Sequence, residues 1–573
     1  MDQQRNLFIA IAISVVILIS FQFFFEKKTP PPAPNVATGA ATSNGQAPGA
    51  PAADNATIPA LPATSHAVPR EQALAGSPRI AIATPRLKGS INLTGARIDD
   101  LTLTDYRETV APDSPQIVLL APDESEHPYY MQFGWVAGDV GVKVPGNDTH
   151  WTASGGTLSQ DHPVDLTWDN GQGLKFTRRY AVDADYMFTV TETVANSGTH
   201  TVALHPYGFV RRIGEVPVSS TYLLHEGPIG VFNGTLQDSY KYSSLKTDIP
   251  DEFPSLGGWM GITDKYWLTA LIPPQDEALK GRFSRTERDH VDVYQVDYTG
   301  AEHEVAPGAS VSTEAHVFAG AKTVALLDRY ETRYRIPRFD RAIDFGWFYF
   351  LTKPIFLTLD FFYNLIGNFG LAIMALTVII KLIFFPLANK SYRAMSKMKK
   401  LQPEMQKLRE KYGDDKEKMN KETMALYKRV GANPMAGCLP ILIQIPVFFS
   451  LYKVLYVTIE MRHAPFFGWI HDLSAPDPTT FVNLFGLIPF APPEISFLHI
   501  GAWPLIMGVT MFLQQKLNPQ PPDPMQAKMF MILPFVFTFM LSQFAAGLVI
   551  YWSWNNLLSI AQQWVIMRRA GAA

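Results

Sequence analysis

The chain has 573 residues, of which 47% are hydrophobic, and its formal net charge is only -3. This balance gives no reason to expect a DNA-binding protein. The single cysteine, Cys438, excludes an intrachain disulfide and a thiolate metal cluster. The GxxxxGKS/T, HExxH and GxSxG motifs are missing, so the usual signatures of nucleotide hydrolysis, zinc proteolysis and serine hydrolysis are lacking. We therefore expect neither an enzyme nor a protein that needs a cofactor or a metal.

The N-terminal part predicts a membrane anchor on a tether. Residues 1–25 contain an apolar run of spanning length from Leu7 to Phe25, without a small-residue cleavage pattern or a lipobox cysteine after it. We expect this first transmembrane segment to stay in the mature protein. Residues 26–78 are rich in Pro, Ala, Thr, Gly and Asn and poor in apolar side chains, which predicts a disordered linker.

From residue 79 the hydrophobic pattern takes a period of two, as in Ile80 and Ile82, with turn signals between the runs. Residues 79–335 therefore predict one large antiparallel β-sandwich, long enough to bury its own core and closed by a short helix at Thr323–Arg335. The histidines and carboxylates of this stretch have no metal-ligand spacing. We expect them in solvated turns and in the core.

Residues 346–366 are apolar enough to span a membrane but contain Lys353, Asp360 and Asn364. At about 100° per residue these three side chains fall within one narrow stripe. A helix that lies in the membrane interface explains this stripe better than a span does.

Residues 370–388 form an apolar run of spanning length with one cation, Lys381, near its middle. A charge at bilayer depth costs roughly 3 kcal/mol, so such a residue usually faces a bundle interior or a water-filled cavity. Thr377 lies one turn earlier on the same face. The alternatives are a lysine that snorkels to the interface or one that a carboxylate neutralises. No Asp or Glu occurs in a later apolar run, which weakens the second alternative.

Residues 389–430 predict a basic helical hairpin, because 13 Lys and Arg face only 6 Asp and Glu between Asn389 and Arg429. The positive-inside rule places this hairpin in the cytoplasm and the β domain outside. The hairpin either only sets the topology or also forms a landing surface for lipid headgroups or ribosomal RNA. Its methionines predict a deformable apolar face for varied partners. The candidate contact residues are Lys397, Lys399, Lys400, Lys407 and Arg409.

Four further apolar runs follow, so the chain has six predicted spans with both termini in the cytoplasm. Taken singly, the polar residues in these runs, such as Gln444, Ser542 and Asn555, would serve as interhelical hydrogen-bond partners. Taken together with Lys381 and Thr377, they could line one wet groove. The four runs are residues 435–457, 503–515, 529–546 and 547–567.

Several segments resemble the YidC/Oxa/Alb membrane insertases, in particular TVIIKLIFFPL, NPMAGCLPILIQIPVFFSLY, DPMQAKMFMILPFVFTFM and AAGLVIYWSWNN. The large outer domain is similar to that of the Gram-negative YidC form. The resemblance implies a multi-domain membrane protein with an all-α five-helix insertase core in residues 370–569, an N-terminal anchor helix and a supersandwich-like periplasmic domain. Its hydrophilic groove would open to the cytoplasm and to lipid and be sealed on the outside.

The resemblance also assigns residues to this groove. Lys381 matches the position of the family's groove cation, which is usually an arginine. Thr377, Gln444 and Tyr551 match other groove positions, and Trp552 stands where relatives have a tyrosine. No long basic extension follows Arg569, so any ribosome contact would fall to the cytoplasmic loops.

The sequence thus predicts an insertase and chaperone of the bacterial inner membrane. The resemblance implies nascent transmembrane segments as clients, with the Sec translocon, the ribosome and membrane lipids as further partners. Two other classes stay open. A small-solute transporter or channel would also place polar residues near the midplane, although no inverted repeat is visible. Alternatively, the sandwich is a periplasmic binding scaffold that the helices merely anchor.

Overall fold

The structure, a computed structural model, describes residues 67–139, 141–214, 216, 224–412, 415–431, 439–488, 499–518 and 524–569. The predicted N-terminal span and most of the predicted linker lie outside these residues. The described part of the linker belongs to the β domain. Helix α2 (Arg70–Ala75) precedes the first strand, and Arg70 forms an ion pair with Asp100 and donates to Thr102 Oγ1 at 3.2 Å. These contacts connect residues before the predicted boundary at residue 79 to the β domain.

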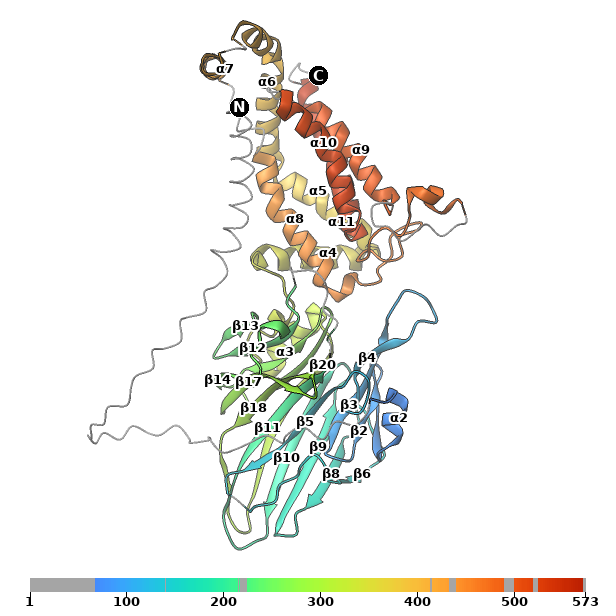
Figure 1. Cartoon of the computed structure of the whole chain (residues 1–573), viewed down its shortest axis with the longest axis vertical. Helices are drawn as coiled ribbons and strands as arrows, with labels where there is room; N and C mark the ends of the chain where they lie inside the picture. The colour runs from blue at the N-terminus through green and yellow to red at the C-terminus, as the bar shows by residue number, and fades with distance from the viewer. Residues whose placement is uncertain are drawn as a thin grey trace, which may run out of the picture. The chain divides into compact units, whose positions relative to one another are not determined.

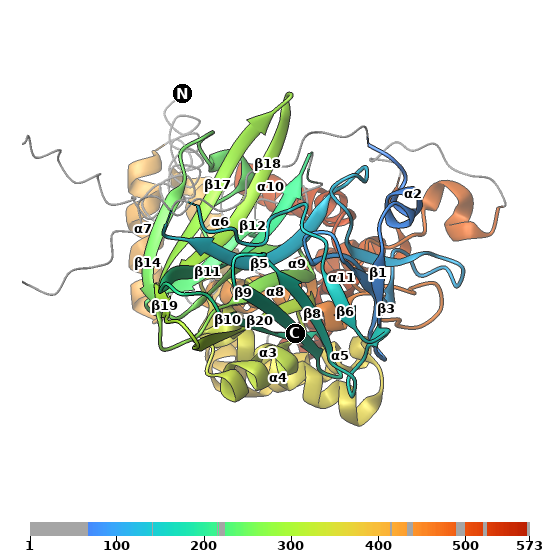
Figure 2. The same cartoon turned by 90° about the horizontal axis from the view of Figure 1, so that it is seen from below.

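The β domain consists of two sheets, and the prediction of a large antiparallel sandwich is confirmed (Figures 1 and 2). Every strand pair is antiparallel except the short parallel pair β1 and β7. The first sheet has the order β14 (Asp251–Leu256), β17 (Ala278–Arg288), β18 (Val291–Gly300), β11 (Val202–Ile213), β5 (Tyr129–Ala137), β3 (Arg97–Arg107), β2 (Leu87–Asn92), β1 (Arg79–Ala83), β7 (Thr157–Leu158), with β19 (His303–Val305) beside β11 and β4 (Gln116–Leu120) beside β3.

The second sheet contributes the other half of the sandwich core. Buried apolar side chains of both sheets belong to one cluster, which explains why a stretch of this length folds as one unit. The order of the second sheet is β13 (Thr235–Gln237), β12 (Gly227–Phe232), β15 (Trp259–Thr263), β16 (Trp267–Ile272), β20 (Ser310–Ala321), β10 (Met187–Asn196), β9 (Leu174–Val182), β8 (Val164–Asp169), β6 (Thr152–Ser154).

Strand β9 shows how the alternating pattern builds this core. Its even-numbered residues from Leu174 to Val182 are buried, and this set includes the charged side chain of Arg178. Arg178 forms an ion pair with Glu192 of β10, donates to the Phe133 carbonyl at 2.5 Å and lies over the Trp151 ring. The next residue, Arg179, points outward and pairs with Asp165 at the surface. A buried charge is tolerated here because its hydrogen bonds are satisfied.

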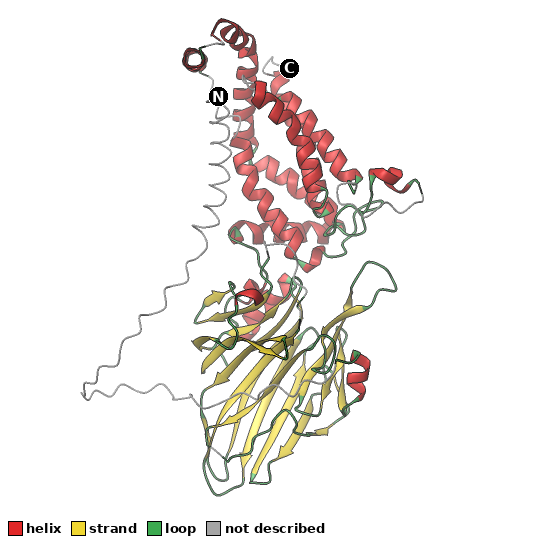
Figure 3. Ribbon diagram, viewed as in Figure 1, coloured by secondary structure: helices red, strands yellow, loops and turns green. Residues whose placement is uncertain are grey.

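Apart from α2, the described α-helices follow the strands in the chain. Figure 3 shows the helices in red and the strands in yellow. α11 packs against α5, α6, α8 and α9, while α10 packs against α9 and α4 against α5 and α8. The start of α11 is fixed by hydrogen bonds from the Ala546 and Gly547 amides to loop carbonyls after α8. The described α-helices after the strands are α3 (Val324–Tyr334), α4 (Tyr349–Ile366), α5 (Phe369–Ile383), α6 (Phe385–Tyr412), α7 (Lys416–Val430), α8 (Leu439–Val457), α9 (Ala502–Leu517), α10 (Pro524–Leu541) and α11 (Ala546–Arg569).

The predicted span at residues 370–388 consists of two helices with a bend between them. α5 ends at Ile383, α6 begins at Phe385, and the two helices are bent by 68°. Pro386 explains the break, because proline disfavours a helical conformation at the residue before it and clashes with the carbonyl four residues earlier. Among the described residues, no single helix is both long and apolar enough to cross a membrane, and only this bent pair meets the criterion jointly.

α4 has two apolar faces. One is buried through Ile355, Phe356 and Leu359, and the other exposes four large side chains, Phe350, Leu357, Phe361 and Leu365. The predicted polar stripe lies between the faces. Within it Asn364 donates to Asp360 at 3.2 Å, while Lys353 reaches Asp328 at 2.8 Å and Asp340 at 2.9 Å. This arrangement is compatible with a helix at a membrane interface, which stays a prediction.

The hairpin of α6 and α7 uses its methionines differently from the prediction. Met395 is buried against Ile566 of α11. Met398 and Met405 pack against the buried residues Leu401 and Leu426 inside the hairpin. The prediction of a methionine docking face was therefore wrong for these residues, because the stripe forms the contact between α6 and α7 and between α6 and α11.

The end of α8 and the loop after α8 contact two parts of the chain: the β domain and the segment that follows the β domain. Lys453 Nζ and Asp344 are 2.8 Å apart, and Arg462 donates to the Arg107 carbonyl at 2.6 Å. Glu460 accepts the amide of Val324, the first residue of α3, at 2.9 Å through one carboxylate oxygen. Its other oxygen is buried and has no hydrogen-bond partner within the described chain. Burial raises the pKa of Glu460 to about 7.

We predict that Arg178→Met destabilises the β domain by about 3 to 5 kcal/mol, because it leaves the Glu192 carboxylate buried without its partner. Arg179→Met is the matched control one residue away and should change stability by less than about 1 kcal/mol, since its ion pair is exposed. Urea unfolding of the full chain, followed by far-UV circular dichroism, measures both. Equal losses in the two variants would contradict the role assigned to Arg178.

We also predict a pH-dependent stability that Glu460→Gln removes. The folded pKa of about 7 lies above the ordinary value of 4.5, so the folded state binds the proton more tightly. The contribution of Glu460 to the free energy of unfolding should therefore be greatest below about pH 4.5. It should fall as the pH rises to 7, by up to about 3 kcal/mol. The difference between wild-type and Glu460→Gln unfolding curves at pH 5 and pH 8 isolates this contribution. A constant difference across this range would rule it out.

Candidate functional site: polar residues between the helices

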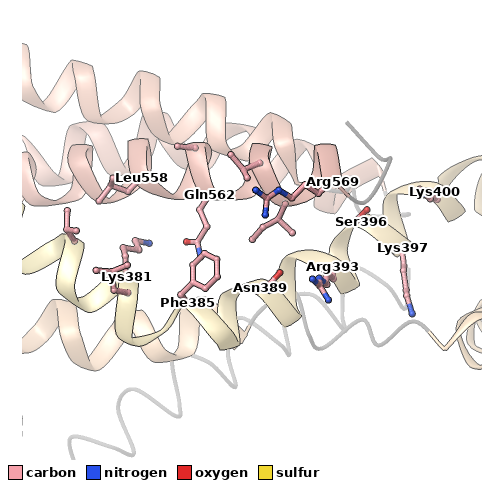
Figure 4. A pocket seen from close by; sticks show the side chains of 15 residues that line it. Lys381, Phe385, Asn389, Arg393, Ser396, Lys397, Lys400, Leu558, Gln562 and Arg569 are labelled. Carbon is pink, nitrogen blue, oxygen red and sulfur yellow. The ribbon is translucent and has the colours of Figure 1, made fainter.

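Lys381 lies in the last turn of α5 and extends toward α11 (Figure 4). Its Nζ donates to Ser559 Oγ at 2.7 Å, and Ser559 donates in turn to the Asn555 carbonyl at 2.7 Å. No carboxylate of the described chain forms an ion pair with Lys381. The ammonium group is therefore solvated by a hydroxyl and not neutralised, which is an arrangement that leaves donor capacity for water or for another acceptor.

Two cavities meet at Lys381. The larger one, which we call the basic cleft, has a volume of about 800 Å³ and lies between α5, α6 and α11. The smaller one, which we call the inner pocket, has about 50 Å³ and includes Gln444 of α8. Gln562 lines both cavities, and Figure 4 shows it extending with Lys381 into the space between the helices. Its side-chain amide nitrogen is buried and has no hydrogen-bond partner among the described residues.

The structure brings two further predicted residues together. Gln444 Nε2 of α8 donates to the hydroxyl of Tyr551 of α11. Tyr551 is buried, and Gln444 reaches the inner pocket beside Lys381. A polar pair thus links α8 to α11 close to the cation on α5.

The other predicted groove residues line neither cavity. Thr377 is buried and donates to the Ile373 carbonyl of its own helix at 2.7 Å. Ser542 donates to the Phe539 carbonyl at 2.7 Å, and Asn555 contacts the site through its carbonyl. Trp552 packs its ring against Phe448 and Phe537. Hydroxyls satisfied by their own helix can stay in an apolar bundle without water.

Sequence reasoning missed Ser559 and Gln562, although a signal was present. Asn555, Ser559 and Gln562 are spaced by four and three residues, which places them on one face of α11. Tyr392 of α6, which lines the inner pocket, was also missed. Its position depends on the bend after α5, which brings the first turns of α6 beside α11.

The basic hairpin residues divide into two groups. Lys397 and Lys400 line the basic cleft, together with Arg393 and Arg569. Lys399, Lys407 and Arg409 do not line it. No Asp or Glu contributes to the lining, so the cleft carries only positive charge.

The fold and the site define a class of protein: a large β-sandwich domain followed by an apolar helical bundle with an uncompensated cation between its helices. Two protein-family models match the chain, the YidC periplasmic domain over residues 79–358 and the 60Kd inner membrane protein over residues 361–572. The crystal structure of an active YidC insertase with its first transmembrane domain resolved is 18% identical, covers 84% of this chain and 91% of that chain, and has a TM-score of 0.37.

Curated relatives match along the whole chain. The membrane protein insertase YidC of Granulibacter bethesdensis is 54% identical over 99% of this chain and 98% of that protein. The membrane protein insertase YidC of Rhizobium meliloti is 52% identical over 100% of this chain and 96% of that protein. The chain therefore belongs to the YidC family, and the resemblance drawn from its sequence is confirmed.

We predict that Gln444 and Tyr551 are energetically coupled. Tyr551→Phe should destabilise the helical bundle by about 0.5 to 1.5 kcal/mol, because it removes the acceptor of the Gln444 amide. In a double-mutant cycle with Gln444→Ala, the two losses should add up to more than the loss in the double variant. Tyr452→Phe is the matched control, since Tyr452 is buried and packs its ring against Tyr456 and Phe544. Reversible unfolding in detergent micelles measures these changes, and strictly additive losses would refute the coupling.

Proposed function

We propose that this chain inserts membrane proteins through a polar groove whose innermost cation is Lys381. The insertase function itself rests on the family: its relatives over the full length are membrane protein insertases, and this chain is one of them. Its clients are accordingly nascent membrane proteins. The family is also one of inner membrane proteins, which puts the chain in that membrane. The relatives favour this function over a transporter, a channel or an anchored scaffold.

The groove mechanism is supported by the surroundings of Lys381. The ammonium group has a hydroxyl partner, Ser559, and no carboxylate within the described chain. A charge in this setting holds water part-way into the bilayer, since it must be solvated. The polar flank of a client then crosses a shorter apolar barrier, while its apolar segment moves sideways into lipid. Burial of that apolar segment drives completion, so no nucleotide and no covalent step are needed.

The predicted groove residues take two roles in this proposal. Lys381 and Gln444 contact the client, because both line the inner pocket. Tyr551 is buried and positions Gln444 by accepting its amide hydrogen bond. Thr377, Ser542, Trp552 and Asn555 support the surrounding helices. Their hydroxyl, ring or carbonyl contacts are made within the bundle.

The proposed topology follows from charge. The hairpin and both termini are cytoplasmic, the β domain is periplasmic, and the first span and the helices α5, α8, α9, α10 and α11 cross the membrane. The hairpin residues Lys397, Lys399, Lys400, Lys407 and Arg409 meet anionic partners, either ribosomal RNA or lipid headgroups. The Sec translocon is the proposed partner for clients that this chain does not insert alone.

Lys381→Ala tests this proposal most simply. Insertion of a client with an acidic translocated tail should fall at least about tenfold. A tenfold change corresponds to about 1.4 kcal/mol, which is less than half of the roughly 3 kcal/mol cost of a charge at the bilayer centre. A client with a neutral tail should be inserted within about twofold of the wild-type rate. Protease protection of the tail in reconstituted vesicles measures both.

Two variants serve as controls for this assay. Lys381→Arg should restore insertion of the acidic client, because it keeps the charge. Thr377→Val should leave insertion nearly unchanged, since the Thr377 hydroxyl bonds only to its own helix in the described contacts. Unchanged insertion of the acidic client by Lys381→Ala would contradict the groove assignment.

A further inference from the structure

We propose that the basic cleft binds one anionic phospholipid, with its headgroup at the rim formed by Arg393, Lys397, Lys400 and Arg569. Its acyl chains would lie along the apolar wall between α5, α6 and α11. This inference deepens the anionic-partner contact proposed above by naming the partner of the cleft, and it does not depend on how clients pass the groove.

The charge of the cleft fits an anionic headgroup. Its lining contains four cationic side chains at the rim, a fifth, Lys381, at the far end, and no acidic side chain. Arg393, Lys397 and Arg569 have no ion-pair partner among the described residues, and all three are exposed. Arg393 and the two lysines lie on α6, whereas Arg569 lies on α11, so the cations approach the rim from two sides. Cations on two sides of the rim attract a phosphate group more strongly than a single cation does.

The walls of the cleft fit acyl chains. Val378, Leu382 and Phe385 line one side, and Val565 lines the other. These four side chains are between 37% and 65% exposed, which is the surface that a membrane would cover. On both sides the apolar residues precede the cations along the helix. The cleft therefore has the same order of apolar and charged parts as a phospholipid.

The length of the cleft matches one leaflet. From Leu558 to Arg569, α11 rises by about 16 Å at roughly 1.5 Å per residue. Half of a hydrocarbon core is about 15 Å thick. A lipid with its headgroup at Arg569 would thus reach with its chains to the level of Leu558, near Lys381. An acidic client segment fits less well, because the cations gather at the rim and the wall below them is apolar.

Native mass spectrometry of the full chain in detergent tests the inference. The chain is titrated with phosphatidylglycerol and with phosphatidylcholine of the same acyl chains. The expected result is one bound phosphatidylglycerol, held at least about tenfold more tightly than phosphatidylcholine. Glycerol 3-phosphate, which has the anionic group without acyl chains, should not displace it.

Matched variants separate the cleft from general attraction to a basic surface. Arg393→Gln with Arg569→Gln should weaken phosphatidylglycerol about 10- to 30-fold, since each cation near a headgroup contributes about 1 kcal/mol. Lys421→Gln with Lys428→Gln removes the same charge from exposed positions of α7 outside the cleft and should change binding less than threefold, an effect on the order of 0.5 kcal/mol.

A second pair of variants tests the apolar wall without changing charge. Ala561→Trp fills the cleft from an exposed position. It should weaken phosphatidylglycerol binding about tenfold, which is the effect expected when about two methylene groups of the lipid lose their apolar contact. Leu557→Trp adds the same ring at an exposed position outside the lining and should have little effect. Melting curves of all variants confirm that they are folded.

Three results would overturn the inference. Equal losses in the two charge-neutralised double variants would mean diffuse attraction to the basic surface. Equal affinity for glycerol 3-phosphate would mean an anion site without a lipid. The third result has two parts: an acidic client peptide displaces phosphatidylglycerol, and the cleft variants weaken binding of that peptide as much as binding of the lipid. Together these would mean that the cleft is a client site. Because lipid binding is measured without insertion, its failure is distinct from failure of the Lys381 insertion test.

Discussion

The structure depends on one constraint: a cation on α5 whose hydrogen-bond partner in the described part of the chain is a serine hydroxyl on α11. A lysine among apolar helices must be neutralised, reach the interface or be wetted. In the described chain no carboxylate approaches Lys381, and two cavities meet at its side chain. Neutralisation is thus excluded for these residues, and the Ser559 hydroxyl together with the two cavities favours solvation of the charge by hydroxyls, amides and water. The polar pair of Gln444 and Tyr551 next to it extends this environment across α8 and α11.

The bend between α5 and α6 determines what lies around that cation. Because the helix axis turns by 68° after Ile383, the basic first half of α6 runs beside the end of α11 and does not continue the line of α5. Tyr392 and Met395 then pack near Ile566, and the cations of α6 face Arg569 across the cleft. The same proline-induced break thus produces the inner pocket, which the client mechanism uses, and the basic cleft, which suits a lipid.

Much of the fold could be predicted from the sequence, because alternation, apolar run length and charge bias are local signals. The sandwich, the helix at Val324–Tyr334 and the basic hairpin all lie where these patterns indicate. The contacts of the site could be predicted only in part. Lys381 stands out because its charge conflicts with its apolar run, whereas Ser559 does not, since serine is common in such helices and its role depends on which face meets α5. The methionine stripe was misassigned because residue spacing indicates that a helix face is apolar but not which element packs against it. Arg178 looks like a surface residue until its neighbours on β10 and β5 are known.

The central claim is that the groove cation is wetted from the cytoplasm, and labelling of a cysteine at position 562 tests it most directly. Gln562 lines both cavities that meet at Lys381. Cys438 is the single cysteine of the chain, so Cys438→Ser gives a background for one introduced thiol. In phosphatidylcholine vesicles with the cytoplasmic face outward, a water-soluble, membrane-impermeant maleimide should modify Gln562→Cys readily and Thr377→Cys hardly at all, because Thr377 is buried and lines neither cavity. Reaction of Gln562→Cys only with a lipid-soluble reagent, or only from the opposite face, would contradict the account.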